Sequence, residues 1–285
     1  MIAPLLLAAD LYLGNLGPER ALWAWHGMAL VRSVEARRSF LEFIRAPKGD
    51  PNRRISVIFI SEVDPGDPGS APAIGDLLAD CHQAGIRVDF LCGDPRYAEP
   101  ARNVGGVSLV DRVLTYNSAQ PPERRFDGFQ YDVEPYSLPD WPSPRLRSGF
   151  LQLFDLSEAE IRKTGSPLQL GAAIPRWFDA PDLGGLYRDV LDRVDYVAVM
   201  DYVDTPRRFV HDASNTVAYA SRVGKKAWLG AEATELPKEP MATFYAEGNA
   251  AMEAAFTAAQ DAFGSSSGFA GVAIEYYDSY LTLRP

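Results

Sequence analysis

The chain has 285 residues, of which 47% are hydrophobic and 23% are charged, as in an ordinary globular protein with a sizeable core. Its net charge of −10 argues against nucleic acids and anionic membranes as partners, since both need a basic protein surface. The two cysteines and three scattered histidines predict neither a disulfide framework nor a zinc site, and we expect no metal and no cofactor.

The beginning of the chain contains a short apolar run at residues 5–9. This run is too short to span a membrane, and it lacks the basic residues that normally precede the apolar part of a signal peptide. We expect residues 1–18 to form a short extension that packs as a strand or as a plug at one end of the domain. A clipped leader is the alternative, so a cytoplasmic and an exported protein both remain open. The sequence makes no prediction of oligomeric state.

Apolar runs of strand length alternate along the chain with longer segments of helical periodicity. The expected strands lie near 21–26, 54–62, 87–92, 127–134, 168–174, 194–202, 226–232 and 269–276. The expected helices lie near 34–45, 72–84, 107–117, 145–164, 183–192, 209–222 and 243–262. Eight strands that alternate with helices predict a parallel sheet closed into a single (β/α)8 TIM barrel domain that spans residues 1–285.

The expected strand at 127–134 carries the strongest functional signal in the chain. Because side chains alternate along a strand, Gln130, Asp132 and Glu134 share one face, while apolar and aromatic residues occupy the other. A polar strand face is costly inside a fold unless it lines a wet site. Two crowded carboxyl groups also raise the pKa of one of them, which keeps a carboxylic acid protonated near neutral pH.

The carboxyl ends of the strands, where such barrels hold their catalytic groups, are rich in acidic and aromatic residues. Acids protonate a glycosidic oxygen and flat rings pack on sugar faces, so this composition predicts a carbohydrate substrate. Core packing for Trp25, loop anchoring for Trp177 and loop capping for Asp94 are the alternative interpretations. The residues expected to contact the substrate are Trp25, Asp94, Gln130, Trp177, Asp201, Glu232, Glu275 and Tyr276.

The segment 127–134 resembles the Asp-Gly-x-Asp-x-Asp-x-Glu signature of family 18 glycoside hydrolases, the chitinases and chitinase-like proteins. Gln130 stands in place of the second aspartate of that signature. Segments 170–175 and 199–202 are similar to the fifth and sixth strands of the family, and Glu275 replaces the usual tryptophan of strand 8. The matching residues of the signature are Asp127, Gly128, Asp132 and Glu134.

The resemblance implies a glycoside hydrolase that acts on an oligo- or polysaccharide by a substrate-assisted, retaining mechanism. Glu134 would be the general acid/base. Asp132 would hold and polarise the substrate's 2-acetamido group, which serves as the internal nucleophile. Tyr202 would form a hydrogen bond with the same group.

Two alternatives stay open. The tripeptide Val133-Glu134-Pro135 is similar to the Asn-Glu-Pro of two-glutamate retaining glycosidases, in which Glu232 or Glu235 would be the nucleophile. The departures from the family pattern, at Gln130 and Val203, instead favour a chitinase-like protein that binds glycans and catalyses weakly.

Overall fold

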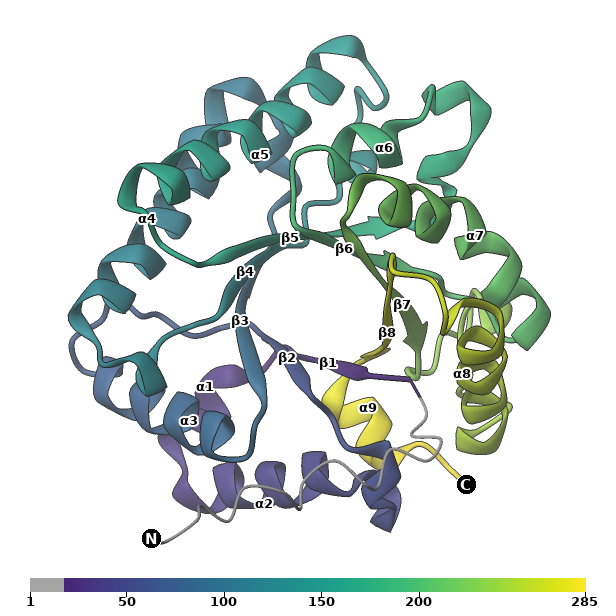
Figure 1. Cartoon of the computed structure of the whole chain (residues 1–285), viewed down its shortest axis with the longest axis horizontal. Helices are drawn as coiled ribbons and strands as arrows, with labels where there is room; N and C mark the ends of the chain where they lie inside the picture. The colour runs from purple at the N-terminus through teal and green to yellow at the C-terminus, as the bar shows by residue number, and fades with distance from the viewer. Residues whose placement is uncertain (1–17) are drawn as a thin grey trace, which may run out of the picture.

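The computed structural model describes residues 18–285, which form a closed barrel of parallel strands with helices around it (Figure 1). Each strand pairs with the next along the chain, and β8 pairs with β1. The predicted single (β/α)8 barrel is confirmed, whereas the packed strand or plug expected within residues 1–18 falls almost entirely outside the described residues. The strands are β1 Arg20–Ala24, β2 Val57–Ile60, β3 Arg87–Cys92, β4 Gly128–Tyr131, β5 Gln169–Pro175, β6 Tyr196–Met200, β7 Lys226–Glu232 and β8 Phe269–Glu275.

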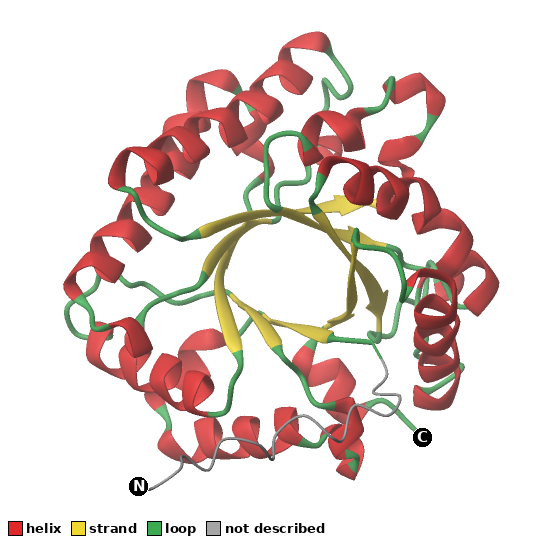
Figure 2. Ribbon diagram, viewed as in Figure 1, coloured by secondary structure: helices red, strands yellow, loops and turns green. Residues whose placement is uncertain are grey.

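The helices form a ring outside the barrel (Figure 2). The sequence predicted all of the α-helices except α1 and α9, which have six residues each and are too short to show a periodic pattern. Within residues 18–285, no helix combines the length and the apolar character needed to cross a lipid bilayer. The α-helices are α1 Gly27–Arg32, α2 Val34–Arg45, α3 Ala71–Gln83, α4 Asn103–Ala119, α5 Pro144–Thr164, α6 Leu186–Leu191, α7 Pro206–Val223, α8 Asn249–Phe263 and α9 Tyr277–Thr282.

Local signals set the ends and the buried faces of the long helices. The Ser33 hydroxyl caps α2 by accepting a hydrogen bond from the Ala36 N–H at 3.1 Å. Gly165 ends α5 with a φ of 65°, a conformation that costs glycine little. Phe150 and Phe154, one helical turn apart on α5, are buried with ring centroids 4.9 Å apart. The apolar faces of the long helices pack against the outside of the barrel. Polar groups are therefore left to its open ends.

The interior of the barrel is filled by large side chains packed against each other. Trp23 contacts Phe59 with ring centroids 5.4 Å apart, and Phe59 stacks on Tyr196 at 5.9 Å and meets the edge of Trp228 at 6.5 Å. Gly171 makes room for this layer, because a Cβ at that position would lie 2.1 Å from the Tyr196 ring. The barrel is therefore a packed core, and reactive groups are confined to its ends.

A buried ion pair lies inside the barrel near the amino-terminal ends of the strands. Asp89 is fully buried and accepts hydrogen bonds from Arg87 at 2.8 and 2.5 Å and from the Tyr196 hydroxyl at 2.6 Å. Burial raises the pKa of Asp89, and Arg87 opposes that rise. A Cβ at Gly128 would lie 2.4 Å from the Asp89 carboxylate. Close packing against Asp89 therefore explains the glycine of the 127–134 signature.

Candidate functional site

The carboxyl ends of β3 and β4 place Asp132 at the mouth of the barrel. β4 ends at Tyr131, three residues earlier than predicted, so Asp132 and Glu134 belong to the loop that follows it. The chain stays extended there, because the Asp132 N–H donates to the Cys92 carbonyl at 2.8 Å. Val133 is buried in the core outside the barrel, so the alternation still turns Asp132 inward.

The Asp132 carboxyl group is enclosed by the protein. Its Oδ1 atom is buried and has no hydrogen-bond partner among the described residues. Burial, together with the nearby Glu134 carboxylate, raises the pKa of Asp132 to about 7. Gly93 allows this close packing, since a Cβ there would lie 1.9 Å from the Asp132 carbonyl oxygen. A proton is therefore held beside Glu134 up to neutral pH.

Glu134 is held by a tyrosine that the sequence analysis did not identify. The Tyr136 hydroxyl donates a hydrogen bond to Glu134 Oε1 at 2.5 Å. Tyr136 lies in the short 3-10 helix Pro135–Ser137 and meets the Trp177 ring edge-on, with centroids 5.0 Å apart. Burial and the Glu134 carboxylate raise the pKa of Tyr136, so the phenol remains a donor. Trp177, predicted to contact substrate, thus supports the residue that orients Glu134.

Tyr202, the third predicted catalytic residue, follows β6 and lies among the acidic side chains. Its pKa is raised well above the usual range, first by burial and then by the nearby carboxylates of Glu275, Glu232 and Asp132. A phenol surrounded by carboxylates keeps its proton and offers a hydrogen-bond donor to the mouth.

The ends of β7 and β8 contribute two further carboxylates. Glu232 and Glu275 are direct partners in the register of the two strands. Glu232 Oε1 accepts a hydrogen bond from the Thr234 N–H at 2.6 Å, and Glu275 Oε1 accepts one from the Trp25 indole at 2.6 Å. Burial raises the pKa of both groups, and the neighbouring carboxylates raise that of Glu275 further. Trp25 is half-buried and packs against the side chains that fill the barrel, so its ring lies between the barrel core and the carboxylates at the mouth.

Two predicted substrate contacts lie just below and beside this group. Gln130 is fully buried in the layer beneath Asp132, where its Oε1 atom accepts a hydrogen bond from the Trp23 indole at 2.8 Å. Tyr276 follows Glu275 and lies edge-on to the exposed His26 ring at 6.2 Å. Gln130 therefore belongs to the core beneath the site, and Tyr276 to its edge.

Two other predicted substrate contacts have different neighbours. Asp94 forms an ion pair with Arg96 at 2.6 Å and accepts the Arg96 backbone N–H at 2.9 Å, which is the loop-capping role considered above. Asp201 is fully buried, and burial raises its pKa well above the usual range. After burial, the charges that act most strongly on it are those of Asp212 and Arg176.

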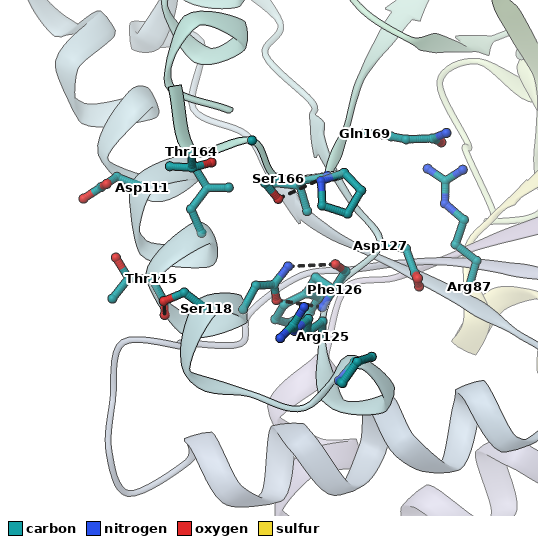
Figure 3. Close-up of a pocket in the computed structure, with 16 residues that line it drawn as sticks. Arg87, Asp111, Thr115, Ser118, Arg125, Phe126, Asp127, Thr164, Ser166 and Gln169 are labelled. Atoms are coloured by element: carbon teal, nitrogen blue, oxygen red, sulfur yellow. Dashed lines mark hydrogen bonds between the residues drawn. The ribbon is translucent and has the colours of Figure 1, made fainter. Parts of the chain in front are cut away.

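A separate hollow of about 710 Å³ opens at the other end of the barrel, beside the amino-terminal ends of β3 to β5 (Figure 3). Asp127, Arg87 and Gln169 lie together on one side of it (Figure 3). Asp127 Oδ2 accepts the Val88 N–H at 2.8 Å and lies 2.9 Å from His82 Nε2. The first aspartate of the motif therefore ties β4 to β3 and α3, away from the carboxylates at the mouth.

Comparison with known proteins adds structural relatives. No family model matches the chain, and no curated protein matches its sequence. A GH18 chitinase from Pseudoalteromonas aurantia has a similar structure, with 12% identity and a TM-score of 0.60 over 93% of this chain and 96% of that one. A glycoside hydrolase family 18 N-acetylglucosaminidase from Paenibacillus barengoltzii gives 12% identity and a TM-score of 0.55 over 92% and 96%.

A third similar structure is the C-terminal domain of a protein from Desulfitobacterium hafniense DCB-2, with 13% identity and a TM-score of 0.54. The match covers 76% of this chain and 66% of that domain. Likeness at this level of identity concerns the fold alone. The chain therefore has a (β/α)8 barrel fold like that of family 18 glycoside hydrolases.

Proposed function

We propose that the protein is a glycoside hydrolase that cleaves an oligo- or polysaccharide, with Glu134 as general acid/base and Asp132 assisting. One observation carries the proposal. Asp132, with its pKa raised to about 7, lies beside Glu134 at the mouth of a barrel whose fold resembles that of chitinases. A protonated acid next to a second carboxyl group is the arrangement that glycosidic bond cleavage needs.

The first chemical step breaks the glycosidic bond. When the substrate binds, the proton held on Asp132 passes to Glu134, which leaves Asp132 as a carboxylate. Glu134 then gives this proton to the glycosidic oxygen as the bond to the anomeric carbon breaks and its electrons move to that oxygen. The oxygen of the substrate's 2-acetamido group supplies the electron pair that forms the new bond to the anomeric carbon. Asp132 accepts a hydrogen bond from the acetamido N–H and stabilises its positive charge, while the Tyr202 hydroxyl donates to the same group.

The second step releases the sugar with retained configuration. Glu134, now a carboxylate, removes a proton from water, and the water oxygen attacks the anomeric carbon and restores the acetamido group. The same carboxyl group must therefore keep its position in both steps. The hydrogen bond from Tyr136 supports this, because it fixes Oε1 and leaves Oε2 for the proton.

A second candidate mechanism uses Glu232 as a nucleophile that attacks the anomeric carbon directly. It is favoured by the position of Glu232, which is only 6% exposed at the end of β7 and close to Tyr202. Glu235 is exposed and lines a different hollow together with Leu236 and Arg284, so it fits this role less well than Glu232.

Substrate pairs that differ only in the 2-acetamido group separate these mechanisms. We expect hydrolysis of chitin oligosaccharides and no hydrolysis of cello-oligosaccharides of the same length, with products measured by chromatography. Cleavage of both series at similar rates would favour Glu232 as the nucleophile. Binding of chitin oligosaccharides without any cleavage would mean that the protein is a glycan-binding member of this fold.

A further inference from the structure

The mouth of the barrel gathers four acidic side chains. Glu232 and Glu275 are partners on paired strands, and the charges of Asp132 and Glu134 act on Glu275. Within residues 18–285, none of these four carboxylates forms an ion pair with Lys, Arg or His. Like charges placed opposite each other on paired strands are destabilising, and a cationic group between Glu232 and Glu275 would remove that cost.

The same barrel neutralises a buried acid elsewhere. Asp89 is fully buried and is matched by two hydrogen bonds from Arg87 and one from Tyr196. The four carboxyl groups at the mouth have no comparable cation among residues 18–285. A positive charge supplied by a ligand would balance the carboxyl groups at the mouth as Arg87 balances Asp89.

The carboxylates are also oriented, with acceptor atoms left over. The Trp25 indole donates a hydrogen bond to Oε1 of Glu275, and the Tyr136 hydroxyl donates one to Oε1 of Glu134. In neither residue does Oε2 accept a hydrogen bond from the described part of the chain. Asp132 Oδ1 is buried without any partner among residues 18–285. Preorganised acceptors without donors fit a ligand that supplies several N–H groups.

We propose that the substrate is an amino-sugar oligomer in which at least one residue carries a free ammonium group, held between Glu232 and Glu275. This inference rests on the proposed glycosidase function and specifies its substrate class. The cleaved bond lies next to an N-acetylated residue, as the acetamido-assisted steps require, and a neighbouring residue is deacetylated. The natural substrate is therefore a partly deacetylated chain.

An ammonium group fits this site better than neutral hydroxyls do. It offers three donors and one positive charge, and hydrogen bonds between charged partners are roughly twice as strong as neutral ones. Burial raises the pKa of Glu232 and Glu275, and an ammonium group beside them would keep both carboxyl groups ionised, which hydroxyl groups would not do. Among residues 18–285, no three His, Cys, Asp or Glu side chains are grouped so that they could hold a metal ion.

The test compares chitin hexamers that are fully acetylated with hexamers of the same length that are about half deacetylated. We expect kcat/KM to be about tenfold higher for the partly deacetylated hexamer, the size expected of hydrogen bonds between charged groups. Added salt should shrink this ratio, because it screens the attraction between the ammonium and the carboxylates. Equal or better cleavage of the fully acetylated hexamer would overturn the inference and leave the glycosidase proposal intact.

Variants assign the preference to the carboxylates. Glu275→Gln should lower the ratio of the two kcat/KM values towards one, and Glu232→Gln provides the same test if the first variant fails to fold. Glu123→Gln is the matched control, because it removes the same charge from an exposed residue before β4, at the opposite end of the barrel. A ratio that is the same in Glu275→Gln and in the wild-type protein would contradict the assignment.

A protein that cleaves neither hexamer would refute the glycosidase proposal but would still test the charge preference. In that case, calorimetric titration with the same two hexamers decides the matter. We expect about tenfold tighter binding of the partly deacetylated hexamer. Equal affinity, or no binding of either hexamer, would overturn the inference.

Discussion

The Tyr136 hydroxyl donates a hydrogen bond to Glu134 Oε1 at 2.5 Å, across the single residue Pro135. The tyrosine is itself held by edge-on contacts with the rings of Trp177 and Phe178, at centroid distances of 5.0 and 6.3 Å. Catalytic groups lose rate steeply when their position is loosened. The geometry therefore gives Tyr136 a positioning role for the proposed acid/base.

Replacing Tyr136 by phenylalanine removes this hydrogen bond and keeps the ring that packs on Trp177. We expect kcat to fall about tenfold, the value of one hydrogen bond to a charged group, with little change in KM. Steady-state kinetics on a chitin oligosaccharide measure both constants. Tyr245→Phe, at an exposed tyrosine, is the control and should leave kcat unchanged. An increase in KM alone would show that Tyr136 serves binding instead of positioning.

Asp132 makes the stability of the protein depend on pH. Its pKa rises from an ordinary 3.8 to about 7 in the folded chain, so between these values the folded state keeps a proton that the unfolded state has lost. The free energy of unfolding therefore decreases as pH rises from about 4 to about 7, and the cost is complete above pH 7.

Asp132→Asn removes this cost because the amide has no proton to lose. We expect the stability of the variant relative to the wild-type protein to increase across that pH window, by about 2–4 kcal/mol in total, and then to level off. Urea unfolding at several pH values measures the difference. A difference that stays constant or shrinks as pH rises would contradict the protonated state assigned to Asp132.

Gly93 links the packing of β3 to the position of Asp132. A Cβ at Gly93 would lie 1.9 Å from the Asp132 carbonyl oxygen, so Gly93→Ala must displace that backbone. We expect a loss of about 1–3 kcal/mol of stability together with a lower kcat. Gly69→Ala is the control, because its Cβ would meet atoms no closer than 3.4 Å. Wild-type stability and activity in Gly93→Ala would show that the close contact is easily relieved.

The sequence predicted the barrel and its strand order because eight apolar runs alternate with helical segments. The bounds of β3 and β7 agree with the prediction, whereas β4 ends at Tyr131, and Asp132 and Glu134 belong to the loop that follows it. Side-chain alternation nevertheless placed Asp132 on the inner face, since the chain stays extended past the end of the strand.

Other features depend on tertiary contacts that the pattern does not contain. Tyr136 lies in a loop, where alternation does not predict direction, so its bond to Glu134 was missed. Asp201 was chosen from its place near a strand end, and its complete burial could not be read from that position alone. The pairing of Arg87 with Asp89 could have been predicted from the sequence, because residues two apart share a strand face.

In the proposed mechanism Glu134 transfers the proton. Its most direct test is the hydrolysis rate of Glu134→Gln on a chitin oligosaccharide that the wild-type protein cleaves, with binding of the same ligand measured by calorimetry. We expect kcat to fall by about 10²–10⁴, the usual contribution of a general acid, while the affinity is largely kept. Hydrolysis by Glu134→Gln at the wild-type rate would show that Glu134 is not the general acid.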